Sequence, residues 1–448
     1  MSAVFHRDLS ADLPVIDRGD GVYLIDSTGK RYLDASGGAA VSCLGHNHSR
    51  VIDRLGEQLA KVSFAHTSFF TNAPAEELAD DLVARAPKGF GSGRAMFLGS
   101  GSEAMEAALK LARQYFLERD EPRRNRFIAR RMAYHGNTLG ALSVGGHMQR
   151  REPYAPLLLD VGRVSPCFAY RFKQQAESDE DYAYRLVQEL DTEIRRIGPE
   201  EVAAFVVEPI SGASLGCVPP VPGYFQGVRE VCDRYGILLI ADEVMCGIGR
   251  TGSFYALEQE GVAPDIITVA KGLGAGYQPI AAVLASEGVV GAIQGGSGVL
   301  ANGHTYMSHA VACAGALAVL NVIDEENLVE RVGTQGRLLD AVLRSRFGQH
   351  PNVGDIRGRG LFVALELVQD RETKTPFPEA LRLATTIKSI ARDCGLICYP
   401  SSGCADGVSG DHVLLAPPYI VDDSQIEEIG EKLEVVLARA LERWHKEG

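Results

Sequence analysis

Short apolar runs alternate with helical patterns through the middle of the chain. Runs of strand length occupy residues 94–98, 127–129, 203–207, 237–241, 266–270 and 280–284, and helical patterns at 104–116, 182–196 and 224–235 separate several of them. Parallel strands that are buried on both faces read as continuous apolar runs, because helices cover both sides of their sheet. The pattern therefore predicts an α/β fold with a mainly parallel central sheet.

The two ends of the chain have a different pattern. Residues 22–26 and 31–34 read as a β-hairpin, whereas helices at 330–347, 379–394 and 423–444 flank strands near 361–366 and 413. Strands and helices that segregate in this way suggest a smaller α+β domain. We expect residues 1–75 and 321–448 to form this small domain together, and residues 76–320 to form the large one.

Composition narrows the class of protein. The chain has 448 residues, 46% apolar and 23% charged, which is ordinary for a globular protein of two or three lobes. A net charge of −13 argues against nucleic acid or an anionic membrane as the main partner. No signal peptide or membrane-spanning run is visible, and the nine cysteines lack metal-ligand spacing. We expect a cytoplasmic protein without a metal site.

Two charged residues follow consecutive buried strands of the predicted sheet. Asp242 ends the run at 237–241, and Lys271 follows the run at 266–270 and precedes a glycine-rich stretch. Ligands of open α/β sheets bind at the carboxyl ends of the strands. A lysine there suits a Schiff base, and an acid suits the nitrogen of a pyridinium ring. On these two residues alone, a buried ion pair that closes the top of the sheet is the simpler reading.

The segment after the strand at 94–98 is a candidate anion site. Ser100 and Glu103 have capping-box spacing at the start of a helix, and Gly101 and Ser102 lie between them. The free N–H groups and the dipole of such a helix end favour a phosphate.

Two other motifs suggest different classes of enzyme. Gly99-x-Gly101-x-x-Ala104 fits a relaxed dinucleotide fingerprint, as in an NAD-dependent oxidoreductase, but the next strand ends in basic residues rather than the required acid. Gly212-x-Ser214-x-Gly216 matches the nucleophile elbow of serine hydrolases, but two prolines follow where that motif needs a helix. Neither class is favoured.

Several motifs, in their order along the chain, resemble those of the class III aminotransferases that depend on pyridoxal phosphate. They are Ser100-Gly101-Ser102-Glu103-Ala104, Tyr134-His135-Gly136, Glu208-Pro209, Leu239-Ile240-Ala241-Asp242-Glu243-Val244, Ala270-Lys271-Gly272 and Gly303-His304-Thr305-Tyr306. The resemblance implies an α/β enzyme of fold type I with pyridoxal 5'-phosphate as cofactor. It also implies a homodimer, or a dimer of dimers, with active sites at the subunit interface.

The resemblance assigns a catalytic pair and the residues around the cofactor ring. Lys271 is similar to the lysine that forms a Schiff base with the cofactor and then acts as a base. Asp242 is similar to the acid that keeps the ring nitrogen protonated. Tyr134 and Val244 would lie on the two faces of the ring, and His135 belongs to the same cofactor-binding motif as Tyr134.

Other residues of the resemblance concern the phosphate and the order of the site. Ser100, Gly101 and Ser102 resemble the phosphate loop, and Thr305 is similar to a threonine that reaches the phosphate from the neighbouring subunit. Glu208 resembles an acid that orders the site around Asp242 and the ring oxygen.

One departure from the family concerns the acceptor substrate. Many relatives carry an arginine before Ala-Pro-Pro that binds the acceptor carboxylate, and residues 405–415 here contain none. We therefore expect pyruvate to be a better acceptor than 2-oxoglutarate. Arg150, Arg357 and Arg359 are candidates for this task elsewhere in the chain, and a structural role suits each of them equally.

The function predicted from the resemblance is that of an ω-type aminotransferase, which moves an amino group from an amine or ω-amino acid to a small oxo acid. Aminomutases, racemases and decarboxylases share the fold and the motifs, and they are the alternatives within the family. A catalytically silent binding protein is an alternative of another class, which the intact pair of Lys271 and Asp242 disfavours.

Overall fold

A seven-stranded sheet forms the centre of the protein. The structure, a computed structural model, describes residues 3–447, with side chains except at 443 and 445–447. The strand order is β4-β10-β9-β8-β7-β5-β6, and only β10 runs antiparallel to its neighbours. The strands are β4 (Arg94–Leu98), β5 (Arg126–Arg130), β6 (Gly162–Val164), β7 (Val202–Val207), β8 (Leu238–Asp242), β9 (Ile266–Val269) and β10 (Ala281–Ala285). The predicted mainly parallel sheet is confirmed.

Helices cover both faces of this sheet, as the continuous apolar runs require. Successive side chains of β10 point to opposite faces of the sheet. Ala281 and Val283 pack with α4 on one face, whereas Ala282 and Leu284 pack with α3 and α11 on the other. The second face is also covered by α8 and α9. The helices are α3 (Ala73–Ala84), α4 (Gly101–Leu117), α8 (Asp179–Ile197), α9 (Tyr224–Tyr235), α10 (Glu287–Gly295) and α11 (Ala310–Glu325).

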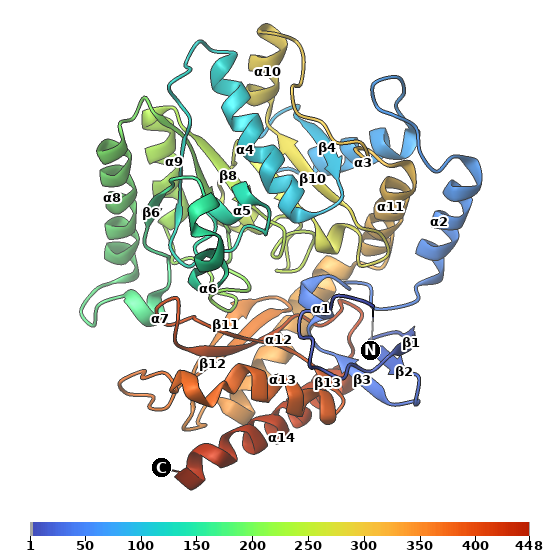
Figure 1. Cartoon of the computed structure of the whole chain (residues 1–448), viewed down its shortest axis with the longest axis vertical. Helices are drawn as coiled ribbons and strands as arrows, with labels where there is room; N and C mark the ends of the chain where they lie inside the picture. The colour runs from blue at the N-terminus through green and yellow to red at the C-terminus, as the bar shows by residue number, and fades with distance from the viewer. Residues whose placement is uncertain (1–2, 448) are drawn as a thin grey trace.

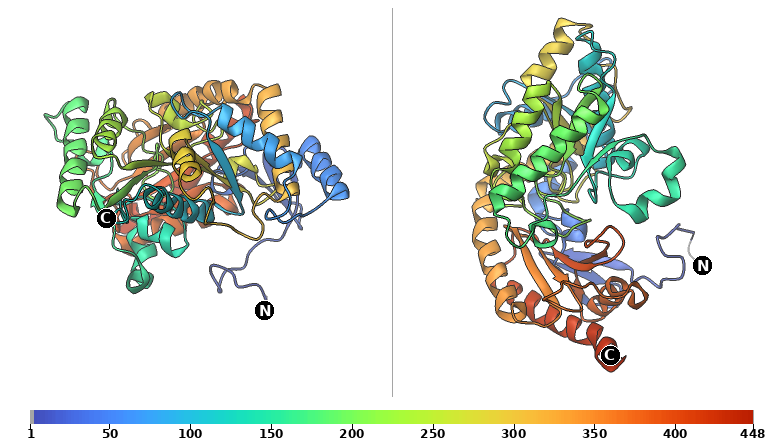
Figure 2. Two further views of the ribbon diagram at one scale, coloured as in Figure 1. Left: turned by 90° about the horizontal axis from the view of Figure 1, so that it is seen from above. Right: turned by 90° about the vertical axis from the view of Figure 1, so that its left-hand side faces the viewer.

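The two ends of the chain lie together beneath the central sheet. In Figure 1 the blue N-terminal strands and the orange to red C-terminal segments share the lower part of the molecule, and Figure 2 shows the same division from the side. One four-stranded sheet joins them directly, because β13 (Leu396–Ile397) pairs in parallel with β3 (Arg31–Asp34). The predicted hairpin is confirmed as β2 (Tyr23–Asp26) and β3, with β1 (Ile16–Asp20) added at its edge.

The C-terminal part adds a second four-stranded sheet, in the order β11-β12-β15-β14, and three long helices. The elements are α12 (Leu328–Phe347), β11 (Val353–Arg359), β12 (Phe362–Leu367), α13 (Leu383–Asp393), β14 (Tyr399–Ser402), β15 (Asp411–Leu415) and α14 (Asp423–Glu447). The helix expected over residues 379–394 is wrong at its start. A 3-10 turn (Glu379–Leu381) comes first, and Arg382 then adopts a left-handed backbone with φ of 46°, which an α-helix cannot contain.

The remaining helices are short, apart from α2 (Ser49–Lys61). They are α1 (Gly37–Ala40), α5 (Leu139–Val144), α6 (Met148–Arg151) and α7 (Ala169–Phe172). Across residues 3–447 no helix has both the length and the apolar character needed to cross a membrane.

Five parallel strands open onto one edge of the central sheet. β5, β7, β8 and β9 pair in parallel, and β4 has the same direction because β10 is antiparallel to both β4 and β9. The segments after all five strands therefore meet at a single edge, where open α/β sheets bind their ligands.

Candidate active site

Lys271 lies at this edge in a strained backbone position. It follows β9 by two residues and opens the 3-10 turn η3 (Lys271–Leu273), with a φ of 48° that non-glycine residues seldom adopt. Such conformations persist where the surrounding structure enforces them, often at functional sites. Burial lowers the pKa of Lys271, while the nearby carboxylates of Asp242 and Glu208 act in the opposite direction. A lysine with a lowered pKa is a better nucleophile and base, because more of it is neutral.

A cavity of about 500 Å³ surrounds Lys271. All the residues predicted to contact a cofactor line it except Thr305: Ser100, Gly101, Ser102, Tyr134, His135, Glu208, Asp242, Val244 and Lys271. They follow the carboxyl ends of β4, β5, β7, β8 and β9, so the strand order itself gathers them. The structure thus brings together segments that are up to 171 residues apart in the sequence, since Ser100 and Lys271 share this cavity.

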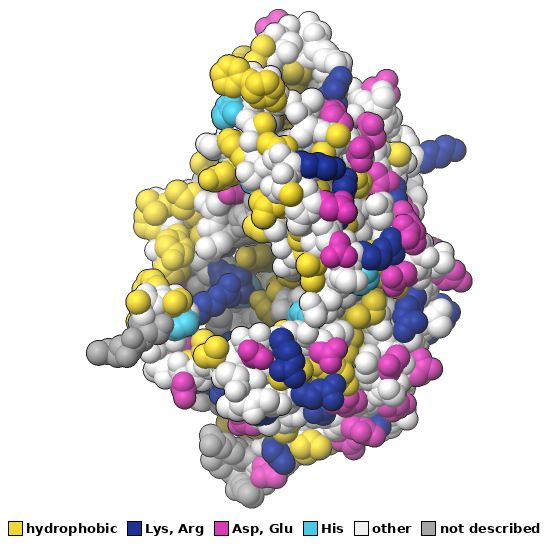
Figure 3. Space-filling view, turned by 90° about the vertical axis from the view of Figure 1, so that its right-hand side faces the viewer, with side chains coloured by type: hydrophobic (Ala, Val, Ile, Leu, Met, Phe, Trp, Pro, Cys, Tyr) yellow, Lys and Arg dark blue, Asp and Glu magenta, His cyan; other side chains and the backbone are white. Residues whose placement is uncertain are grey.

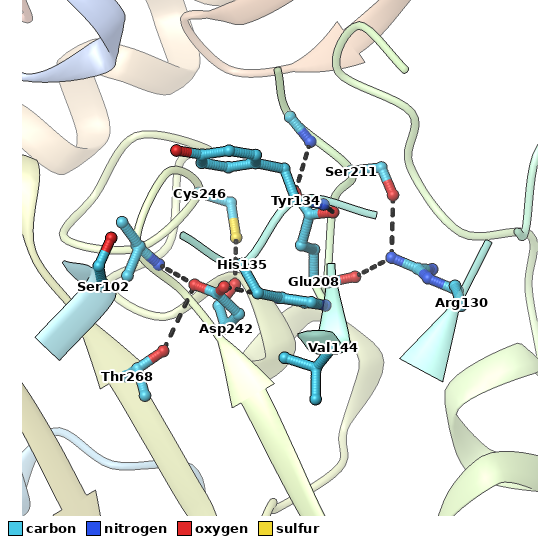
Figure 4. Close-up of polar contacts among 12 residues, drawn as sticks. Ser102, Arg130, Tyr134, His135, Val144, Glu208, Ser211, Asp242, Cys246 and Thr268 are labelled. Carbon is cyan, nitrogen blue, oxygen red and sulfur yellow. Dashed lines mark hydrogen bonds and ion pairs between the residues drawn. The ribbon is translucent and has the colours of Figure 1, made fainter. Parts of the chain in front are cut away.

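Asp242 is buried and held by three donors. His135 Nδ1 lies 2.7 Å from Oδ2, while the backbone N–H of Val244 and the hydroxyl of Thr268 reach Oδ1 at 3.1 and 3.3 Å. Figure 4 shows His135 and Thr268 on different sides of the carboxylate. An ionised carboxylate only accepts hydrogen bonds, so His135 donates from Nδ1. This arrangement fixes the carboxylate and leaves its charge next to the cavity.

Glu208 forms a second buried acid beside the first. Its Oε1 accepts from the backbone N–H of Tyr134 at 3.2 Å, and its Oε2 accepts from that of Gly212 at 2.9 Å. Burial raises the pKa of Glu208, and the positive charges of His135 and Arg130 oppose that shift. The guanidinium of Arg130 also donates to the Glu208 carbonyl and to Ser211 Oγ, as Figure 4 shows. Glu208 therefore links the end of β7 to the Tyr134 segment.

The N-terminus of α4 points its unpaired groups at the cavity. The first N–H groups of an α-helix have no acceptor within the helix, and those of Gly101 and Ser102 belong to this class. A Cβ on Gly101 would lie 3.0 Å from Val244 Cγ1, so only glycine lets the two segments approach this closely. Ser102 Oγ accepts from Asn137 N–H at 2.9 Å, which leaves its own proton to donate. The predicted cap is present, because Ser100 Oγ accepts from the backbone of Glu103 at 3.2 Å.

Thr305 lies outside the cavity that surrounds Lys271. It is exposed in the loop before α11 and does not line the cavity of its own chain. A contact between Thr305 and a ligand in this cavity would need a second copy of the chain, as the family resemblance implies.

Sequence reasoning missed several residues of the site. Thr268, inside β9, carries no motif signal because β-branched residues are common in any strand. Gln278 and Ile280 line the cavity just before β10, and Val41 reaches it from the N-terminal segment. For Gln278 and Ile280, the glycine run before Gln278 was the only hint in the sequence. For Val41 there was no hint, because nothing in the sequence relates residue 41 to this edge of the sheet.

Two of the three arginine candidates have structural partners. Arg357 is buried and donates to the Gly216 carbonyl at 2.7 Å, with Glu366 at 2.6 Å. Arg359 donates to Glu260 at 2.7 Å. Arg150, in contrast, places its guanidinium 4.7 Å from the centre of the Tyr134 ring, which lines the cavity.

The serine-hydrolase motif is not a catalytic elbow here. Ser214 is buried, and the segment returns through a bridge between Ser211 and Val218 instead of entering a helix. The first helix after it is α9, which starts at Tyr224.

Comparisons with known proteins identify the family of this chain. The sequence model of the class-III aminotransferase family matches residues 6–437. An uncharacterised aminotransferase of Schizosaccharomyces pombe is 48% identical over 421 residues, which cover 94% of this chain and 91% of the relative.

Solved structures give the same result. An (S)-enantioselective omega-transaminase from Thermomicrobium roseum superposes with a TM-score of 0.91 at 34% identity, covering 98% of this chain and 97% of the other. The omega-transaminase of Pseudomonas jessenii in complex with PMP gives 0.88 at 36% identity, with 96% and 93% covered. The chain belongs to the class-III aminotransferases, enzymes of fold type I.

Proposed function

We propose that this aminotransferase is of the ω type: it moves an amino group from an amine or ω-amino acid to a small oxo acid, preferably pyruvate, with pyridoxal phosphate bound through Lys271. One observation carries the proposal. A lysine with a lowered pKa shares a single cavity with the Asp242–His135 pair and with the N-terminus of α4. This combination provides a nucleophile, a partner for a pyridinium nitrogen and an anion site.

Class III aminotransferases use pyridoxal phosphate, and the residues of this cavity fit that group. The phosphate would lie against the N–H groups of Gly101 and Ser102, where the absent Cβ of Gly101 leaves room. Tyr134 and Val244 would contact the ring, and Asp242 would face its nitrogen. Pyridoxal phosphate supplies an aldehyde that forms a Schiff base with a primary amine, and a ring that withdraws electrons when its nitrogen carries a proton.

The protein's own groups then have separate tasks. Asp242 would favour a proton on the ring nitrogen, because its negative charge stabilises the protonated form. His135 keeps the Asp242 carboxylate oriented through the 2.7 Å contact. Lys271 Nζ, whose pKa is lowered by burial, would accept a proton from the substrate carbon that bears nitrogen and hold it for return to the substrate. Val41, Ile210 and Ile280 give the cavity an apolar wall.

The type of substrate is inferred from two observations. The two solved relatives described above are named omega-transaminases, which supports an amine or ω-amino acid as donor. The loop at 403–410 and the following β15 contain no arginine that could bind the second carboxylate of 2-oxoglutarate. Pyruvate has only one carboxylate and does not need that contact.

A panel of amine donors tests the proposal. Each amine is mixed with the holoenzyme and with pyruvate or 2-oxoglutarate, and the cofactor absorbance and the products are followed. We expect the amino group to appear on alanine, at a rate roughly tenfold or more above that of glutamate formation. Products that keep their own nitrogen, as in racemisation, amino migration or decarboxylation, would contradict the proposal, and faster glutamate formation would contradict the acceptor preference.

A further inference from the structure

Arg150 carries a charge for which the chain provides no counter-ion. Within residues 3–447 its guanidinium has neither a hydrogen bond nor an ion pair, and it lies over the Tyr134 ring, 4.7 Å from the ring centre. Other arginines near the site are different. Arg130, Arg250, Arg357 and Arg359 all donate to carbonyl or carboxylate oxygens of the chain.

Arg151, the next residue, has the hydrogen-bond acceptors that Arg150 lacks. Arg151 belongs to the same short helix, α6, and donates to the carbonyls of Leu142, Ser143 and Gly145 at 2.6, 2.6 and 2.7 Å. Arg151 thus holds the segment in place, whereas Arg150 is only partly buried and has no acceptor to hold. An arginine fixed at its base and unpaired at its tip is available to bind an anion from solution.

The position of α6 sets Arg150 next to Tyr134, which lines the catalytic cavity, although Arg150 itself is not one of the lining residues. Gln149 Nε2 donates to the Val408 carbonyl at 3.4 Å, and a Cβ on Gly407 would lie 3.1 Å from Met148 Cγ. The segment therefore lies against the loop of residues 403–410, which contains no basic residue. Figure 1 places α6 at the boundary between the two halves of the molecule, and Figure 3 shows basic side chains in a hollow at the level of this boundary.

The charge of Arg150 also affects the pKa of Lys271. It contributes to the lowering of the Lys271 pKa, as expected of a cation near the cavity, although burial is the larger cause. Tyr134 joins the two, because its ring lines the cavity and carries the guanidinium on its face. A carboxylate bound at the Tyr134 side of this cavity would have the Arg150 guanidinium as the cation beyond that ring.

We propose that Arg150 binds the carboxylate of the oxo-acid substrate, an inference that rests on the proposed aminotransferase function. The planar guanidinium pairs with a carboxylate through two parallel hydrogen bonds. When an amine without a carboxylate occupies the site, the same side chain stays on the Tyr134 ring, where its contact is weak enough to be exchanged. One arginine serves one carboxylate, which agrees with a preference for pyruvate over a dicarboxylic acceptor.

The test compares acceptors with and without a carboxylate. The pyridoxamine form of the enzyme is reacted with pyruvate and, separately, with butanal, and the amine half-reaction is measured with 1-phenylethylamine. In Arg150→Leu we expect kcat/KM for pyruvate to fall roughly 10- to 100-fold, mainly through KM, because a hydrogen-bonded ion pair is lost. The reactions with butanal and with 1-phenylethylamine should change less than about threefold. Arg150→Lys, which keeps the charge without the fork, should lie between Arg150→Leu and wild type.

A binding measurement and a neighbouring variant complete the test. Propionate, an unreactive analogue of pyruvate, should bind the wild-type holoenzyme by calorimetry and bind Arg150→Leu roughly tenfold or more weakly. Gln149→Ala changes the same segment without removing a charge and should leave propionate binding unchanged. Equal losses with pyruvate and butanal, or unchanged propionate binding in Arg150→Leu, would overturn the assignment of Arg150 and leave the proposed function intact. A wild-type enzyme that aminates no oxo acid would overturn the proposed function, and this inference with it.

Discussion

The chemical character of Lys271 arises from where its backbone lies. Lys271 lines the cavity after the end of β9, in a left-handed backbone conformation, and burial lowers its pKa. The opposing carboxylates of Asp242 and Glu208 keep the shift within limits. At the scale of single residues, the pKa of Lys271 is thus lowered by burial and raised by two nearby acids.

Asp242→Asn tests the proposed role of the Asp242 charge. The amide would keep the shape of the side chain but lose the charge that favours a protonated ring nitrogen. We expect the amine half-reaction to slow by on the order of 100-fold or more, with little change in thermal stability. Thr268→Val is the control, since it removes only the 3.3 Å contact to Oδ1 and should have a much smaller effect. A near-normal rate in Asp242→Asn would exclude this role.

The residues that sequence reasoning could find are those with a distinctive place in the chain. Asp242 and Lys271 interrupt apolar runs at strand ends, and Gly101 and Ser102 open a capped helix, so their chemistry is visible in the pattern. Thr268 and Val41 could not be found in this way. Their side chains are ordinary in type, and only the pairing of strands and the return of the N-terminal segment bring them to the cavity.

At the scale of elements, a buried ionic cluster connects the C-terminal strands β11 and β12 to segments around the central sheet. Arg357 in β11 reaches Glu366 in β12 at 2.6 Å and the carbonyl of Gly216 at 2.7 Å, and Arg171 also contacts Glu366. Glu366 is fully buried. A buried acid of this kind is tolerated only while its cations are present.

Arg357→Ala should therefore act on stability rather than on specificity. We expect a loss of about 3–5 kcal/mol in the free energy of unfolding, measured in urea, because Glu366 loses one of its cations. Arg359→Ala is the control, because its pair with Glu260 is partly exposed and should cost about 1 kcal/mol or less. An unchanged stability together with a lower kcat/KM for pyruvate would show that Arg357 binds the acceptor instead.

Elements were predictable where their apolar pattern was strong. The helices α4 and α9 and six strands of the central sheet follow from the apolar pattern: β4, β5, β7, β8, β9 and β10. β1, β6 and β11 were not predicted, because sequences such as Ile16–Asp20 and Val353–Arg359 are polar and glycine-containing and owe their extended form to a partner strand. These strands form because they pair with other strands, and no local sequence pattern encodes that pairing.

At the scale of the whole molecule, one face carries side chains that a single chain leaves uncovered. Phe69, Phe70 and Tyr306 are 78%, 67% and 69% exposed, and ring contacts through Phe64 and His66 connect them. Hydrophobic side chains also gather along the left border of the view in Figure 3. Exposed patches of this kind often mark interfaces. Together with the position of Thr305 outside its own cavity, they support our proposal of a homodimer with shared active sites.

A mixed dimer tests the shared site. If Thr305 serves the partner's cavity, a dimer of one Lys271→Ala chain and one Thr305→Ala chain has one site with both changes and one with neither. Its activity should then be about half that of the wild type, because the dimer is symmetric before the changes. Each parent homodimer is the control and should be impaired in both sites. If the mixed dimer has no fully active site, Thr305 acts within its own chain and the shared-site proposal fails.

The central claim is that Lys271 carries the cofactor, and borohydride reduction tests it most directly. Reduction of the holoenzyme fixes the cofactor to the lysine that holds it, and peptide mapping identifies that lysine. We expect the label on Lys271, with none in Lys271→Ala and an unchanged label in Lys110→Ala, which alters an exposed lysine on α4. A label on any other lysine of the wild-type enzyme, or a full label in Lys271→Ala, would contradict the account.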